Sequence, residues 1–155
     1  MTNARALVLW VGIDYMPKWR VDCVDTLKHF HPELEIDFIW ERRDMKNPCL
    51  YSDCMRKEYC SLNPFRLWVD SDIELLAPLP LGDEPFLANE NGAHLSIVWS
   101  GNNPSMIKQK RSWTKTYATI KKTIKPDGLY RHWQTGPNGE RVPRTDLGYK
   151  SEDFI

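Results

Sequence analysis

Residues 6–11, ALVLWV, form an uninterrupted apolar run that ends at Gly12. Strands buried on both faces of a sheet have this composition, and such strands occur in parallel sheets that helices cover. Residues 36–40, IDFIW, alternate apolar and polar side chains over most of their length, which predicts a second strand. The two segments therefore predict an α/β protein whose sheet starts with this pair.

A helix is expected between the two strands. Pro17 suits the first position of a helix, apolar residues then recur at helical spacing through Val24 and Leu27, and Pro32 ends the pattern. The order strand, helix, strand implies a parallel pair with a right-handed crossover. His29 and His31 follow one face of this helix, and we expect both at the surface.

The rest of the chain predicts alternating helices and strands in a single domain over residues 1–155. We expect a helix at 51–62 that starts near Ser52 or Asp53, and then a strand at 66–70. A loop that contains Pro78 and Pro80 should follow, and after it short strands at 86–88 and 95–99. A last helix is expected from Asn102-Asn103-Pro104 to residue 124, with loop-like chain after 129.

Composition indicates an ordinary globular protein, with 41% hydrophobic and 27% charged residues. No apolar run reaches the roughly 18 residues that a membrane span needs. The short polar N-terminus does not resemble a signal peptide, so we expect a cytoplasmic protein with reduced thiols. An alternative for Cys49, Cys54 and Cys60 is a zinc site.

Asp70 and Asp72 follow the strand predicted at 66–70. In extended chain, residues two apart point the same way, so both carboxylates face one small volume. Ligands of open α/β sheets gather beyond the carboxyl ends of strands. Carboxylates suit Mn²⁺ or Mg²⁺, and such sites leave positions for substrate phosphates. The alternative is a pair of solvated loop acids.

Asp53 and Arg56 lie one helix upstream of that strand and share a helix face. The simpler interpretation is a local ion pair, which contributes little when it is exposed. The functional interpretation gives Asp53 a ribose or sugar hydroxyl and Arg56 a phosphate or a sugar.

These motifs resemble the glycosyltransferases with a DXD-containing sugar-binding region, which include polymannosyl and capsule-type transferases, and the catalytic domains of large glucosylating toxins. The resemblance covers most of the chain, from about residue 7 to residue 137. The matching segments are Leu9-Trp10-Val11-Gly12, Met16-Pro17-Lys18-Trp19, Ser52-Asp53-Cys54-Met55-Arg56, Val69-Asp70-Ser71-Asp72 and Gln134-Thr135-Gly136-Pro137.

The resemblance implies a compact GT-A fold, a Rossmann-like mixed sheet flanked by helices, and a metal-dependent, hexosyl-type transferase. Its donor would be a nucleotide-sugar, with a UDP-sugar favoured, and the anomeric configuration would be retained. Trp10 would stack on the base, and Gly12, two residues later, would be a further substrate-binding residue. Asp53 and Arg56 would contact the ribose and the sugar-phosphate, and Asn89 would contact a sugar hydroxyl. Asp72 would be the direct metal ligand. Asp70 would belong to the same metal site and would contact the sugar-ribose side of the donor.

The chain departs from the family pattern at two places. Asn63-Pro64-Phe65-Arg66 stands where relatives usually have Gly-Gly, so the turn before the DXD strand must differ. Many relatives add a metal or diphosphate contact after Thr-Gly-Pro, and here 18 residues follow Pro137. A further metal ligand is then missing or comes from His132, Asp146 or Asp153.

Charge is uneven along the chain, with a balance of −6 over residues 1–107 and +6 over residues 108–155. Residues 108–125 hold seven basic residues and no acid, with Trp113 and Tyr117 between them. The segment is either an amphipathic helix with a solvated basic face or a site for a polyanionic acceptor or a phosphorylated lipid head. Two rival functions remain: a nucleic-acid-binding module that uses this helix, and a two-carboxylate nucleotidyltransferase.

Overall fold

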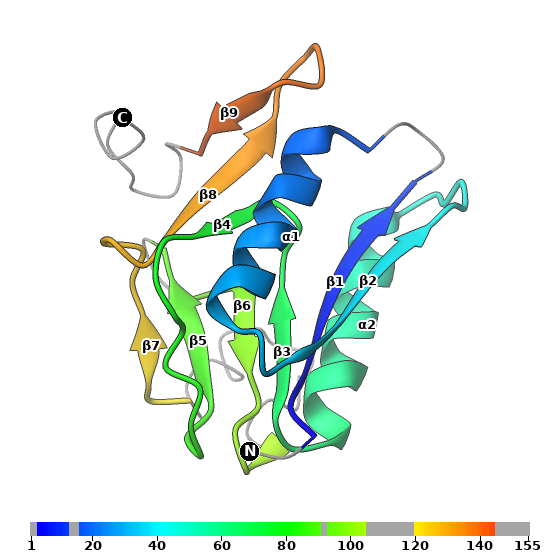
Figure 1. Cartoon of the computed structure of the whole chain (residues 1–155). Coiled ribbons are helices and arrows are strands. Elements are labelled where there is room, and N and C mark those ends of the chain that lie inside the picture. The colour runs from blue at the N-terminus through cyan, green and yellow to red at the C-terminus, as the bar shows by residue number, and fades with distance from the viewer. Residues whose placement is uncertain (1–2, 13–15, 91–92, 105–119, 145–155) are drawn as a thin grey trace.

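The computed structural model describes residues 3–12, 16–90, 93–104 and 120–144 (Figure 1). Two helices and nine strands make up the described chain. In order they are β1 (Arg5–Val11), α1 (Lys18–Phe30), β2 (Glu35–Glu41), α2 (Pro48–Leu62), β3 (Arg66–Val69), β4 (Ile73–Leu75), β5 (Phe86–Asn89), β6 (Ala93–Trp99), β7 (Thr123–Ile124), β8 (Tyr130–Thr135) and β9 (Arg141–Pro143).

Six strands form the main sheet in the order β2-β1-β3-β6-β5-β7. Strand β1 pairs in parallel with both β2 and β3, whereas β6 runs antiparallel to β3 and to β5. Strand β7 pairs in parallel with β5. The predicted α/β class, the mixed sheet and the parallel β1–β2 pair around a helix are confirmed.

The two helices cover opposite faces of this sheet. Side chains point to alternate faces along a strand. Ala6 and Val8 of β1 therefore pack with Leu27 of α1 on one face of the sheet, and Leu7 and Leu9 pack with Cys60 of α2 on the other. Neither helix in the described part of the chain is long and apolar enough to cross a membrane.

A second sheet, in the order β4-β8-β9, continues from the end of β3 (Figure 1). The three residues Asp70–Ser71–Asp72 connect the two sheets, and backbone hydrogen bonds fix both ends of this connection. The Asp70 amide donates to the Ser96 carbonyl oxygen at 2.8 Å, and the Trp133 amide donates to the Asp72 carbonyl oxygen at 2.9 Å. The aspartate pair therefore lies at a hydrogen-bonded junction between the two sheets.

Three segments differ from the expectation. The segment after residue 129 is not loop-like throughout, because β8 and β9 form a hairpin there and β8 also pairs with β4. The proline-containing loop begins only after β4. The helix expected to reach residue 124 does not, since Thr123–Ile124 pair with β5. Residues 105–119, which carry most of the expected basic helix, lie outside the described residues.

Two smaller expectations were wrong. Helix α2 begins at Pro48 rather than near Ser52 or Asp53, because the Asn47 side chain caps it by accepting from the Leu50 amide at 3.0 Å. His31 is buried, not at the surface: its Nε2 accepts from the Leu79 amide at 2.8 Å and its Nδ1 contacts Glu33 at 2.9 Å.

Candidate functional site

A hollow of about 380 Å³ opens at the carboxyl ends of β1 and β3. Strand β1, helices α1 and α2, and the turn after β3 line it. Five of the seven residues predicted for the site are among its lining residues: Trp10, Asp53, Arg56, Asp70 and Asp72. The structure thus brings together side chains that lie as far apart as residues 10 and 72 in the sequence.

The other two predicted residues, Gly12 and Asn89, do not line the hollow. Gly12 joins β1 to β2, since its amide donates to the Glu41 carbonyl oxygen at 3.0 Å and its carbonyl accepts from the Trp40 indole at 2.9 Å. Its φ of +146° is a conformation that residues with a side chain rarely adopt. Asn89 ends β5 and pairs with Ala93. The sugar-hydroxyl contact expected of Asn89 therefore has no support from its position.

Asp70 and Asp72 have different surroundings. Asp70 accepts a hydrogen bond from the Trp68 indole at 2.7 Å and lies 4.0 Å from the Arg56 guanidinium. Burial, and then the nearby charge of Asp72, raise the pKa of Asp70 to about 6. Burial would also raise the pKa of Asp72, but its hydrogen bond to His132 and the charge of that ring outweigh burial and lower it.

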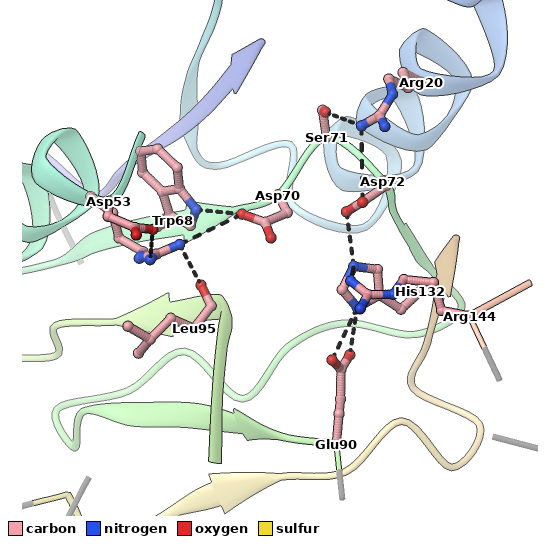
Figure 2. Close-up of polar contacts among 11 residues, drawn as sticks. Arg20, Asp53, Trp68, Asp70, Ser71, Asp72, Glu90, Leu95, His132 and Arg144 are labelled. Atoms are coloured by element: carbon pink, nitrogen blue, oxygen red, sulfur yellow. Dashed lines mark hydrogen bonds and ion pairs between the residues drawn. The ribbon is translucent and has the colours of Figure 1, made fainter. Parts of the chain in front are cut away.

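His132 sits between two carboxylates (Figure 2). Its Nε2 lies 3.0 Å from Asp72 Oδ1, and its Nδ1 lies 3.0 and 3.1 Å from the two oxygens of Glu90. The side chains of both His132 and Glu90 are fully buried. Burial alone would lower the pKa of His132, but the hydrogen bonds to Asp72 and Glu90 outweigh it and raise the pKa to about 10. The Arg144 guanidinium approaches Nε2 at 3.5 Å.

Asp70, Asp72 and His132 form a group with the chemistry of a divalent-cation site. One ligand atom from each lies within 4.8 Å of the others. His132 was one of three residues expected to supply a further ligand; the other two, Asp146 and Asp153, lie outside the described residues. The cysteines form no such group within the described chain, because Cys60 is buried while Cys49 and Cys54 are exposed. The zinc alternative is therefore wrong.

The Asp53–Arg56 contact exists, but it is not an exposed surface pair. Arg56 donates to Asp53 at 2.5 Å and to the Leu95 carbonyl oxygen at 3.2 Å. Its side chain is only 8% exposed, so the guanidinium is held as part of the wall of the hollow. Both Asp53 and Arg56 line the hollow.

Sequence analysis missed Arg20. This α1 residue is 8% exposed and lines the hollow. It donates to Ser71 Oγ at 2.7 Å and to Thr135 Oγ1 at 2.8 Å, and its guanidinium lies over the rings of Trp10 and Trp19. A signal was present, because Arg20 precedes Val24 and Leu27 by four and seven residues and so shares their buried face.

Glu90 is a second residue that was not predicted to belong to the site. Nothing in the sequence connects it with His132, since 42 residues separate the two and the β4–β8 pairing that positions His132 was not expected. The hydrogen-bonded chain Asp72–His132–Glu90 is thus a product of tertiary structure.

The chain was compared with protein-family models, with curated proteins and with solved structures. None of the three comparisons found a match. Function must therefore be inferred from the side chains that line the hollow and from the motifs that carry the resemblance.

Proposed function

We propose that this protein is a metal-dependent glycosyltransferase that takes its donor from a nucleotide-sugar, with a UDP-sugar favoured. One observation carries the proposal: Trp10, Asp53, Arg56, Asp70 and Asp72, chosen from sequence motifs alone, line the same hollow. The proposal includes a GT-A type of fold, with which the mixed sheet and its two covering helices are compatible.

The cation would bind to Asp70, Asp72 and His132. Two carboxylates with one imidazole nitrogen favour Mn²⁺ over Mg²⁺, which prefers oxygen ligands. When bound, the cation would neutralise negative charge on the departing diphosphate. Glu90 accepts a hydrogen bond from Nδ1 of His132, which leaves Nε2 as the ring nitrogen that faces the aspartates.

The chain's own residues would bind and orient the donor. Trp10 offers an aromatic surface for the base, although Arg20 already lies over this ring, 4.3 Å from its centroid. Asp53 can accept from a ribose or sugar hydroxyl, and Arg56 can donate to a phosphate or sugar oxygen. In the reaction the bond between the anomeric carbon and the diphosphate oxygen breaks, the acceptor hydroxyl oxygen forms the new glycosidic bond, and its proton passes to the leaving diphosphate. We expect retention of configuration.

The nucleotidyltransferase alternative needs a third carboxylate beside the pair. Glu90, directly after β5, contacts His132 at 3.0 Å. It does not belong to the group of potential cation ligands in the described chain. The geometry therefore favours the transferase.

A nucleotide-sugar panel tests the proposal. The protein is incubated with Mn²⁺ and each UDP-sugar or GDP-sugar in turn, and release of the nucleoside diphosphate is measured. We expect slow hydrolysis of at least one UDP-sugar, and loss of that activity in Asp72→Asn. The matched control Asp22→Asn changes an exposed aspartate of α1 and should keep the activity. Release of no nucleoside diphosphate from any donor would refute the proposal.

A further inference from the structure

Arg20 is a buried cation without a carboxylate at hydrogen-bonding distance in the described chain. Its two terminal nitrogens donate to the neutral hydroxyls of Ser71 and Thr135. Its closest acidic oxygen, on Asp72, is 4.0 Å away, and its Nε has no hydrogen-bond partner among the described residues. Figure 2 shows Arg20 beside Ser71 and Asp72, on the side of the aspartate pair away from Asp53.

Arg56, the other arginine of the hollow, differs in this respect. It is buried to the same extent but contacts the carboxylate of Asp53 at 2.5 Å. Removing a charge from water without a close partner of opposite charge is costly, and burial lowers the pKa of Arg20 even though Asp72 opposes the shift. The folded protein therefore maintains an incompletely compensated positive charge at the wall of the hollow.

The guanidinium is also held in place. It lies 4.3 Å from the centroid of the Trp10 ring and 4.6 Å from that of Trp19. Trp19 in turn donates to the Gly139 carbonyl oxygen of the β8–β9 hairpin at 3.0 Å. A planar, fixed guanidinium loses little conformational freedom when an oxyanion binds, and its geometry matches that of a phosphate.

We propose that Arg20 is a binding residue for a phosphate group, and specifically for the diphosphate of the ligand that occupies the hollow. This inference rests on the proposed function in one respect: the proposed function identifies the ligand that carries the diphosphate as a nucleotide-sugar. Asp72 lies between His132 at 3.0 Å and Arg20 at 4.0 Å. A diphosphate that reaches a cation at Asp72 therefore comes within reach of Arg20, which stabilises its negative charge from the protein side.

Calorimetric titration of the full chain with UDP, uridine and pyrophosphate, each with Mn²⁺, tests Arg20. The variant is Arg20→Met, whose apolar stem can occupy the space between the two indole rings. This change leaves the Ser71 and Thr135 hydroxyls without their donor and Asp72 without its nearby cation, so the melting temperature of the variant is measured alongside binding. The control, Arg5→Gln, removes an arginine of β1 that is paired with Glu35 and Asp37 at the other end of the strand.

The expected result is a loss of at least about tenfold in affinity for UDP and for pyrophosphate in Arg20→Met. The affinity for uridine should remain near that of the wild type, and the affinity for Mn²⁺ alone should not fall, because the variant removes a positive charge 4.0 Å from Asp72. UDP binding within twofold of the wild type in folded Arg20→Met would overturn the proposal. If this variant does not fold, Arg20→Lys provides the test. Lysine keeps the positive charge but lacks the planar guanidinium, so we expect the affinity for UDP to fall at least about threefold.

The two proposals can fail separately. If the wild type binds UDP and pyrophosphate through Arg20 but releases no diphosphate from any nucleotide-sugar, the phosphate site stands and the transferase does not. If the wild type hydrolyses a UDP-sugar and Arg20→Met binds UDP equally well, only the role of Arg20 is refuted. If the wild type binds neither UDP nor pyrophosphate, both proposals fall.

Discussion

Glu90 contacts His132 at 3.0 and 3.1 Å and would act through it on the proposed cation site. We expect Glu90→Gln to lower the affinity for Mn²⁺ about 10- to 100-fold, because the loss of the negative charge makes the imidazole a weaker ligand and loosens its orientation. The measurement is calorimetric titration with Mn²⁺. The control, Glu33→Gln, changes a carboxylate that also contacts a histidine, His31, but lies outside the hollow. Equal losses in the two variants would contradict a specific role for Glu90.

His132 also predicts how stability depends on pH in the metal-free protein. Its pKa is raised to about 10 in the folded state, from an ordinary value of 6.5. A group with a raised folded pKa stabilises the protein fully below its unfolded pKa, and this contribution is lost as the pH rises through the folded value. Urea unfolding in EDTA should therefore show that the advantage of the wild type over His132→Gln shrinks between about pH 6.5 and 10. A constant or growing advantage would contradict the assignment.

At the residue scale, sequence reasoning located the acids better than the cations. Asp70 and Asp72 could be predicted because they follow an apolar strand and lie two residues apart. Arg20 could not be assigned to the site, because a cation at a helical position usually faces solvent and its burial depends on Ser71 and Thr135. His132 could only be named as one of three candidates until the β4–β8 pairing positioned it.

At the scale of elements, helix α1 supports the fold and positions Arg20. Leu27 is 1% exposed within the core cluster, whereas its neighbour Lys28 is exposed. We expect Leu27→Ala to lower the free energy of unfolding by about 2–5 kcal/mol, since it removes buried methyl groups and leaves a cavity. Lys28→Ala should change that free energy by no more than about 0.5 kcal/mol. Urea unfolding measures both, and similar values would contradict the assigned packing of α1.

The elements that could be predicted are those whose own residues carry a strong pattern. Strands β1 to β3 and the helices between them have apolar runs or helical periodicity over at least four residues. Strands β4, β7 and β9 have only two or three residues, too few for a pattern to develop. Strand β8, YRHWQT, is aromatic and polar, and it forms because β4 and β9 pair with it on either side.

At the scale of the whole molecule, the junction between the two sheets concentrates the charged groups. The main sheet supplies Asp70 at the end of β3, and the small sheet supplies His132 from β8. The basic C-terminal part of the chain thus contributes a cation to an acidic turn of the N-terminal part. The polyanionic acceptor suggested by residues 108–125 stays a prediction.

Titration of UDP into the protein by calorimetry, once with Mn²⁺ and once with EDTA, tests most directly whether Asp72 and its neighbours hold a cation for a diphosphate. We predict that UDP binds only with Mn²⁺, that Asp72→Asn weakens this binding at least about tenfold, and that the exposed variant Asp22→Asn binds as the wild type does. UDP affinity that is the same in EDTA, or the same in Asp72→Asn, would contradict the cation site on which the proposed function depends.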